Sequence, residues 1–190
     1  MTKTPLESLR DNLDTLLSAI EDCRARNQVL PCLVLVYSGI DIAASLERVD
    51  GEGTGAAFRR WAARYLLVRG KLDCTPEDLW GARCGIVHTY TTASDQSRMG
   101  RAKEVVYSWG TASAADLAAM VQATGRDYAA IHIDDLVASF RSAVSTFLFE
   151  IAAEKSRLPA VSERAGVWFT NLDKSVGDQF LRVIGRRPDV

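Results

Sequence analysis

The sequence has few of the residues that mark specialised protein classes. It contains four cysteines among 190 residues, and none of them belongs to a C-x-x-C pair. Neither a disulfide scaffold nor a paired-cysteine metal site is therefore expected, and cytosolic thiols would stay reduced. The two histidines, His88 and His132, lie far apart along the chain. We therefore expect no metal and no other cofactor.

The sequence also lacks a long apolar run. The longest, from Val29 to Tyr37, contains Pro31 and is roughly half the length that spans a bilayer. The N-terminus moves directly into a charged amphipathic pattern, without the apolar segment of a signal peptide. We expect a soluble, cytoplasmic protein with no membrane partner.

No excess of charge of either sign is present. A net charge of -1 gives no overall attraction to nucleic acid. The stretch 59–71 nevertheless contains several cations and no acid. It is typical of a solvated helix face, but it could also form a local basic patch. The candidate contacts to RNA are Arg59, Arg60, Arg64, Arg98 and Arg101.

What the sequence does contain is helical periodicity. Apolar residues spaced three and four apart predict amphipathic helices along most of the chain. The segments 104–109 and 128–133 are instead rich in β-branched and aromatic residues and predict two paired strands, joined by a short helix. The expected fold is mainly α, a single-domain helical bundle (about 5–92 and 134–154) with a small two-stranded β element at about 104–133. The expected helices occupy about 4–23, 31–46, 58–70, 75–90, 112–124, 133–151, 159–171 and 173–184.

One predicted helix carries unusual polar residues. It begins at Thr75 with Pro76 at its first position, a strong start signal, and its apolar stripe contains Arg83 beside Ile86 and Tyr90. Burial cannot neutralise a guanidinium, so Arg83 must reach a cleft or pair with an acid. The helix at 31–46 is apolar on all sides and offers Asp41. We therefore predict that Arg83 contacts Asp41, with Asp41 and Tyr90 as supporting residues.

His88 projects about 140 degrees away from Arg83 around an ideal helix. Its side of the helix also carries Gly81, Cys84 and Gly85. Small residues allow another backbone to approach closely, from the same chain or from a second subunit. Arg83 and His88 would then meet only if the helix distorts, or across a cleft or a two-fold axis.

The segment from Arg83 to His88 resembles the R-x4-6-H motif of the HEPN family (higher eukaryotes and prokaryotes nucleotide-binding domain). The resemblance covers roughly residues 5–92 and extends to the helix near 134–154. It implies a helical bundle, commonly dimeric, and in many members a metal-independent ribonuclease whose arginine and histidine meet at the subunit interface. Arg83 would then stabilise the scissile phosphate, and His88 would move the proton of the attacking 2′-hydroxyl or of the leaving group.

The chain departs from that family in two respects. Cys84 follows the arginine where active members often have a polar residue, and the strand-like segments lie outside the minimal bundle. RNA or a nucleotide, a protein partner and a second copy of the chain are the expected partners.

Other interpretations remain open. Arg83 and His88 are structural in a non-catalytic helical interaction module, or they bind a nucleotide or partner without catalysis. Cys84 and His88 are also spaced to touch, as in a nucleophilic dyad or half a metal site. Aromatic residues could stack on bases, although core packing is the commoner role; they are Tyr37, Trp61, Trp80, Tyr90 and Trp109.

Overall fold

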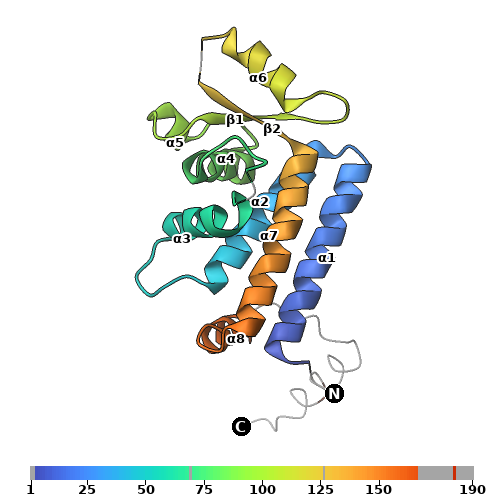
Figure 1. The fold of residues 1–190 in the computed structure, drawn as a ribbon, viewed down its shortest axis with the longest axis vertical. Coiled ribbons are helices and arrows are strands. Elements are labelled where there is room, and N and C mark those ends of the chain that lie inside the picture. The colour runs from blue at the N-terminus through green and yellow to red at the C-terminus, as the bar shows by residue number, and fades with distance from the viewer. Residues whose placement is uncertain (1–2, 69, 126, 167–181, 183–190) are drawn as a thin grey trace.

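The computed structural model describes residues 3–68, 70–125, 127–166 and 182. It confirms the predicted fold class, a mainly helical bundle with a small two-stranded sheet (Figure 1). The elements are α1 (Pro5–Ala25), α2 (Val29–Leu46), α3 (Thr54–Trp61), the π-helical turn η1 (Ala62–Leu66), α4 (Pro76–Thr89), α5 (Asp95–Arg98), β1 (Glu104–Ser108), α6 (Ala114–Gln122), β2 (Tyr128–His132), α7 (Ile133–Ala153) and α8 (Leu158–Gly166).

The predicted helix starts are confirmed by their capping contacts. The Thr4 side chain accepts a hydrogen bond from the Glu7 backbone, and the Glu7 carboxylate accepts one from the Thr4 backbone at 2.7 Å. Thr75 and Asp78 form the same reciprocal capping box at the start of α4. Each box satisfies two backbone donors that a helix start leaves free, which fixes where the helix begins.

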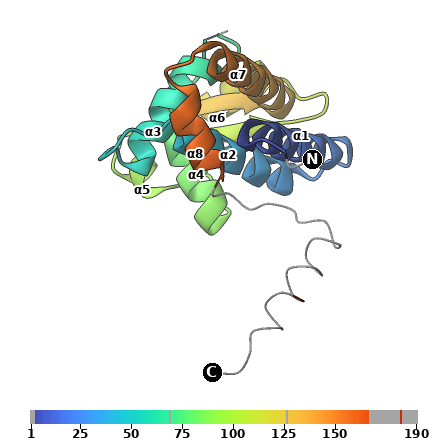
Figure 2. The same ribbon diagram turned by 90° about the horizontal axis from the view of Figure 1, so that it is seen from below.

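Helix α2 is the central element of the bundle, as its apolar sequence predicts. It packs against α1, α3, α4 and α7. In Figure 1, α1 and α7 run along the long axis of the molecule, and α3 and α4 lie across it. Seen from below, α8 crosses the near end of the bundle (Figure 2). The ring of Trp61, at the end of α3, packs in the core against the rings of Phe140 and Phe147 in α7.

Two core helices, α2 and α7, are long and apolar enough to cross a membrane by length and composition. Neither helix is a continuous apolar run, because α2 includes a few small and polar residues and α7 carries charges. Half of the apolar window in α2 is buried inside the fold. Core helices of soluble proteins pass the same test.

The β element forms as predicted. Strands β1 and β2 pair in parallel, with Glu104 opposite Tyr128 and Ser108 opposite His132. Helix α6 makes the crossover between the strands and lies at the far end of the molecule from α8 (Figure 1). Strand β1 also packs on α4, so the sheet borders the helix that carries Arg83 and His88.

Several boundaries differ from the sequence expectations. The short helix α5, which Ser94 caps, lies outside the helix ranges that the sequence predicts. The third helix is not uniform, since it widens into η1, where the Leu67 backbone donates to the Ala62 carbonyl. The helix expected at 173–184 lies outside the described residues except for Arg182, and the end of the one expected at 159–171 lies outside them as well.

Candidate functional site

The predicted contact between Arg83 and Asp41 is confirmed. Arg83 Nε donates to Asp41 Oδ2 at 2.6 Å, and Nη2 lies 2.5 Å from the same oxygen. Only 15% of the Arg83 side chain and 18% of the Asp41 side chain are exposed. The pair therefore joins α4 to the central helix α2 in a largely enclosed position, as expected for a charge that burial cannot neutralise.

Trp80 holds the Arg83 guanidinium from another side. The guanidinium carbon lies 5.2 Å from the centre of the Trp80 ring, within the range of a cation-π contact. Gly55 in α3 leaves room for this ring, because a Cβ at that position would lie 2.9 Å from its atoms. Helix α3 thus fixes the ring that supports Arg83. From the sequence alone, Trp80 is expected only as a base-stacking or core residue.

His88 contacts Arg83 directly within one chain. Arg83 Nη1 lies 2.6 Å from His88 Nε2. The expectation that the two side chains diverge was therefore wrong. The helical wheel gives the direction of the Cα–Cβ bonds, but an arginine side chain is long enough to reach along the helix axis toward the next turn. Since guanidinium nitrogens only donate, His88 Nε2 accepts here and the imidazole proton lies on Nδ1.

The small-residue side of α4 is covered by the same chain. A Cβ on Gly85 would lie 2.4 Å from the Thr91 carbonyl oxygen and 3.0 Å from that of Ala93. A Cβ on Gly81 would lie 3.2 Å from the Cβ of Ala102. The segment that follows α4 therefore folds back across this side, which was one of the two occupants that the sequence predicted.

This return of the chain forms a hollow next to His88. The hollow has a volume of about 300 Å³ and is lined by residues of α4 and α5, among them Cys84, His88, Gln96 and Arg98. His88 itself is exposed. The site therefore has an enclosed half, Asp41 with Arg83, and an open half, His88 with the hollow.

Burial dominates the ionisation of the groups around Arg83. It raises the pKa of the Asp41 carboxyl, against the hydrogen bond and charge of Arg83. One Asp41 oxygen, Oδ1, is buried without a hydrogen-bond partner. Burial also raises the pKa of the Cys84 thiol above its ordinary value of 9.0. Because Cys84 keeps its proton at neutral pH, a nucleophilic dyad with His88 is disfavoured.

Tyr90 does not lie where the apolar stripe predicts. Helix α4 ends at Thr89, and Tyr90 adopts a left-handed conformation with φ 54. That turn directs the side chain to solvent, and 68% of it is exposed. Tyr90 thus contributes no packing to Arg83, although it stands two residues from His88.

The basic stretch in α3 and η1 finds acids elsewhere in the fold. Arg60 binds Glu52 at 2.8 Å, and Arg64 binds Glu150 at 2.7 Å. Arg59 lies 3.7 Å from Glu77. These three arginines therefore do not form a patch of unpaired charge. Arg98 and Arg101 stand apart from them, near α5, where Arg98 borders the His88 hollow.

The aromatic residues divide between core and surface. Tyr37 and Trp61 are fully buried, and the Tyr37 hydroxyl hydrogen-bonds that of Tyr107 at 2.5 Å. Trp109 is half exposed, at the end of the molecule that carries the sheet. Neither Tyr37 nor Trp61 can stack on a nucleic acid base.

A second cluster of charged side chains was not predicted. We call Glu47, Tyr65, Glu150, Glu154 and Arg157 the Arg157 cluster. Arg157 forms an ion pair with Glu47, lies 3.0 Å from Glu154 and 3.2 Å from Glu150, and donates to the Tyr65 hydroxyl at 2.6 Å. Its members come from three separate parts of the chain. The spacing of Glu150, Glu154 and Arg157 was the only local signal.

Comparison of the chain with protein-family models, curated proteins and solved structures finds no significant match. Within the described ranges, no group of three or more histidine, cysteine, aspartate or glutamate side chains is placed to hold a metal ion. The case for a function therefore depends on the geometry of Asp41, Arg83 and His88, which we call the Arg83 site.

Proposed function

We propose that this protein is a cytoplasmic, metal-independent endoribonuclease of the HEPN type, with Arg83 and His88 as its catalytic pair. The observation that carries the proposal is the 2.6 Å contact between Arg83 Nη1 and His88 Nε2, beside an open hollow. The residues that produced the resemblance in sequence are thus in contact, and one of them is exposed.

In the proposed reaction, the 2′-oxygen of a ribose attacks the adjacent phosphorus and the bond to the 5′-oxygen breaks. The products are a 2′,3′-cyclic phosphate and a 5′-hydroxyl. His88 accepts the proton of the 2′-hydroxyl as a general base, and the departing 5′-oxygen takes a proton from solvent. Arg83 donates to the non-bridging phosphate oxygens, whose negative charge increases during attack.

The resting contacts suggest how substrate would prepare the base. His88 Nε2 is occupied while it accepts from Arg83 Nη1. A phosphate is a charged acceptor and competes for that donor, since charge-assisted hydrogen bonds are roughly twice as strong as neutral ones. Binding of RNA would then release Nε2 to accept a proton. Asp41 acts as a positioning residue, because it holds Nε and Nη2 and leaves Nη1 available.

The proposal includes a homodimer, as the family resemblance implies. Tyr90 supports it, since this large side chain is mostly exposed two residues from His88. Light scattering should then give twice the 20.8 kDa of one chain. A monomeric mass would remove the dimer from the proposal and leave the intrachain site in place.

The test is cleavage of mixed single-stranded RNA in the presence of EDTA. We expect wild-type protein to cleave, and His88→Ala to lower the rate by roughly 10²- to 10⁴-fold, the usual contribution of a general base. Arg83→Lys keeps a charge but loses the planar fork, and should also be strongly impaired. Circular dichroism checks that each variant is folded. Absence of cleavage by the wild type would refute the ribonuclease.

The alternative is a non-catalytic helical interaction module in which Arg83 and His88 are structural. One observation favours it: Asp41 and His88 take up Nε, Nη2 and Nη1 of Arg83, and Trp80 covers the guanidinium. Under this alternative no RNA is cleaved, and Arg83→Lys acts on folding stability alone.

A further inference from the structure

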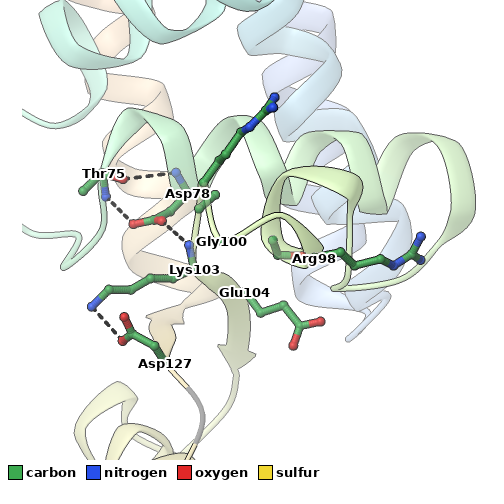
Figure 3. A pocket seen from close by; sticks show the side chains of 10 residues that line it. Thr75, Asp78, Arg98, Gly100, Lys103, Glu104 and Asp127 are labelled. Atoms are coloured by element: carbon green, nitrogen blue, oxygen red, sulfur yellow. Dashed lines mark hydrogen bonds and ion pairs between the residues drawn. The ribbon is translucent and has the colours of Figure 1, made fainter.

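A pocket of about 540 Å³ lies beside the start of β1 (Figure 3). The buried carboxylate of Asp78 shapes its wall, since it accepts from the Thr75 backbone at 2.9 Å and from the Lys103 backbone at 2.6 Å. Asp78 therefore ties the start of α4 to the segment that enters β1. Thr75 and Lys103, whose backbones donate to Asp78, also line the pocket.

The side chains around this pocket divide into two sets. In Figure 3, Lys103 and Glu104 leave the backbone in opposite directions, as neighbouring residues of an extended chain do. Lys103 binds Asp127 at 3.0 Å on one side. Glu104 lies on the side of Arg98. Lys103 and Asp127 already bind each other, so the charges that can meet a ligand are those on the side of Glu104 and Arg98.

Two of the lining charges have no partner in the part of the chain that the structure describes. They are Arg101 and Glu104, for which no side-chain hydrogen bond or ion pair occurs there. Arg98 is held only by Asp95, in a pair that is mostly exposed to solvent. A ligand for this pocket would carry an anion for Arg98 and Arg101 and a hydrogen-bond donor for Glu104.

The pocket is connected to the Arg83 site through one side chain. Arg98 lines both this pocket and the hollow that contains His88. An RNA strand that places one phosphate at His88 would therefore pass Arg98 before it reached Arg101 and Glu104. Single strands suit such a path, because an unstacked base can turn into a pocket, whereas a duplex keeps its base edges paired.

We propose that this pocket is a nucleotide subsite for single-stranded RNA, in which Arg98 and Arg101 bind backbone phosphate and Glu104 selects a base that presents an amino group. Cytosine is such a base, since its N4 amino group donates to a carboxylate. Uracil presents a carbonyl oxygen at the same position and would face Glu104 with an acceptor. This inference rests on the proposed function insofar as RNA is the ligand.

The test measures binding rather than cleavage. Fluorescence anisotropy compares single-stranded oligocytidylate with oligouridylate of the same length and label, using wild-type protein and His88→Ala. We expect cytidylate to bind about tenfold more tightly in both proteins, the value of one hydrogen bond to a charged group. Because His88→Ala cannot use the proposed base, its preference is independent of whether the protein is a ribonuclease.

Glu104→Gln should abolish the preference for cytidylate, because an amide can face either base with a donor or an acceptor. The matched control is Glu163→Gln, which removes the same charge from the exposed side of α8 and should keep the preference. Arg101→Gln should weaken the binding of both oligonucleotides alike. Equal binding of the two by wild type, no binding of either, or equally tight binding of duplex RNA would each overturn the proposal.

Discussion

Arg83 and Arg157 both join the central helix α2 to a neighbouring part of the bundle, but they end in different surroundings. Arg157 meets the carboxylates of Glu47, Glu150 and Glu154, and Glu47, the C-cap of α2, is only 5% exposed. Arg83 meets one carboxylate and then an exposed imidazole beside a hollow. An arginine whose donors end on three carboxylates and a buried tyrosine hydroxyl is a clamp, a fixed link between parts of the bundle. One whose last donor ends on a solvent-accessible neutral group can exchange that partner for a ligand.

The largest effect on the free energy of unfolding should come from removing the Arg157 guanidinium from the Arg157 cluster. Arg157→Met leaves Glu47 buried without its charged partner, and removal of one member of a buried ion pair costs about 3 to 5 kcal/mol. Urea unfolding measures the loss. Arg141→Met is the matched control, since Arg141 binds Glu21 at the surface, where such pairs contribute less than about 1 kcal/mol.

The same pair of variants tests the contrast between the two arginines. Folded Arg157→Met protein should retain whatever RNA binding the wild type has, because the Arg157 cluster lies outside the proposed RNA path. An Arg157→Met variant as stable as Arg141→Met would show that the cluster is not a clamp.

A smaller effect is expected at the Arg83 site from Gly85→Ala. The new Cβ would meet the carbonyl oxygens of Thr91 and Ala93, which belong to backbone that must move away. Overpacking of this kind costs roughly 1 to 3 kcal/mol. The His88 ring signals in an NMR spectrum should shift, because the displaced segment forms the hollow beside it.

Gly53→Ala is the control for this substitution. A Cβ at Gly53 would meet nothing within 4 Å, and alanine at this helix start should cost about 1 kcal/mol or less. Unchanged stability and unchanged His88 signals in Gly85→Ala would mean that the returning segment does not depend on a glycine there.

The sequence predicted the features that depend on local patterns. The helix start near residue 4, the start at Thr75 and the existence of each strand follow from residues within a few positions of one another. The contact of Arg83 with Asp41 was also predictable, because a buried guanidinium requires an acid and the central helix offered one.

The remaining features depend on distances that a sequence pattern does not contain. The contact of Arg83 with His88 required the length of the arginine side chain, which a helical wheel omits. The Arg157 cluster assembles residues more than 80 positions apart, such as Tyr65 and Glu150. Arg60 and Arg64 appeared free of acids for the same reason, since their partners come from outside the stretch 59–71.

The smallest expected effects concern two carboxylates that each bind an arginine. Glu52 binds Arg60, and Asp41 binds Arg83. The hydrogen bond from Arg60 is the main cause that lowers the pKa of Glu52 from 4.5 to about 2, and Arg60 also donates to the Glu47 carbonyl. Because the pKa of Glu52 is lower in the folded protein than in the unfolded chain, ionised Glu52 stabilises the fold at pH values above 4.5. This contribution is lost as the pH falls from 4.5 toward 2. Burial raises the pKa of Asp41 from 3.8, so its contribution is complete below 3.8 and is lost as pH rises through the folded value.

Urea unfolding between about pH 2 and pH 7 should therefore give opposite slopes for Glu52→Gln and Asp41→Asn relative to wild type. As pH rises, Glu52→Gln becomes relatively less stable, because only the wild type gains an ionised partner for Arg60. Asp41→Asn becomes relatively more stable, because the amide avoids the cost of a buried charge and still accepts from Arg83. Parallel slopes would mean that Arg83 compensates Asp41 as fully as Arg60 compensates Glu52. Burial of Asp41 would then not make its effect on stability depend on pH in the opposite direction from that of Glu52.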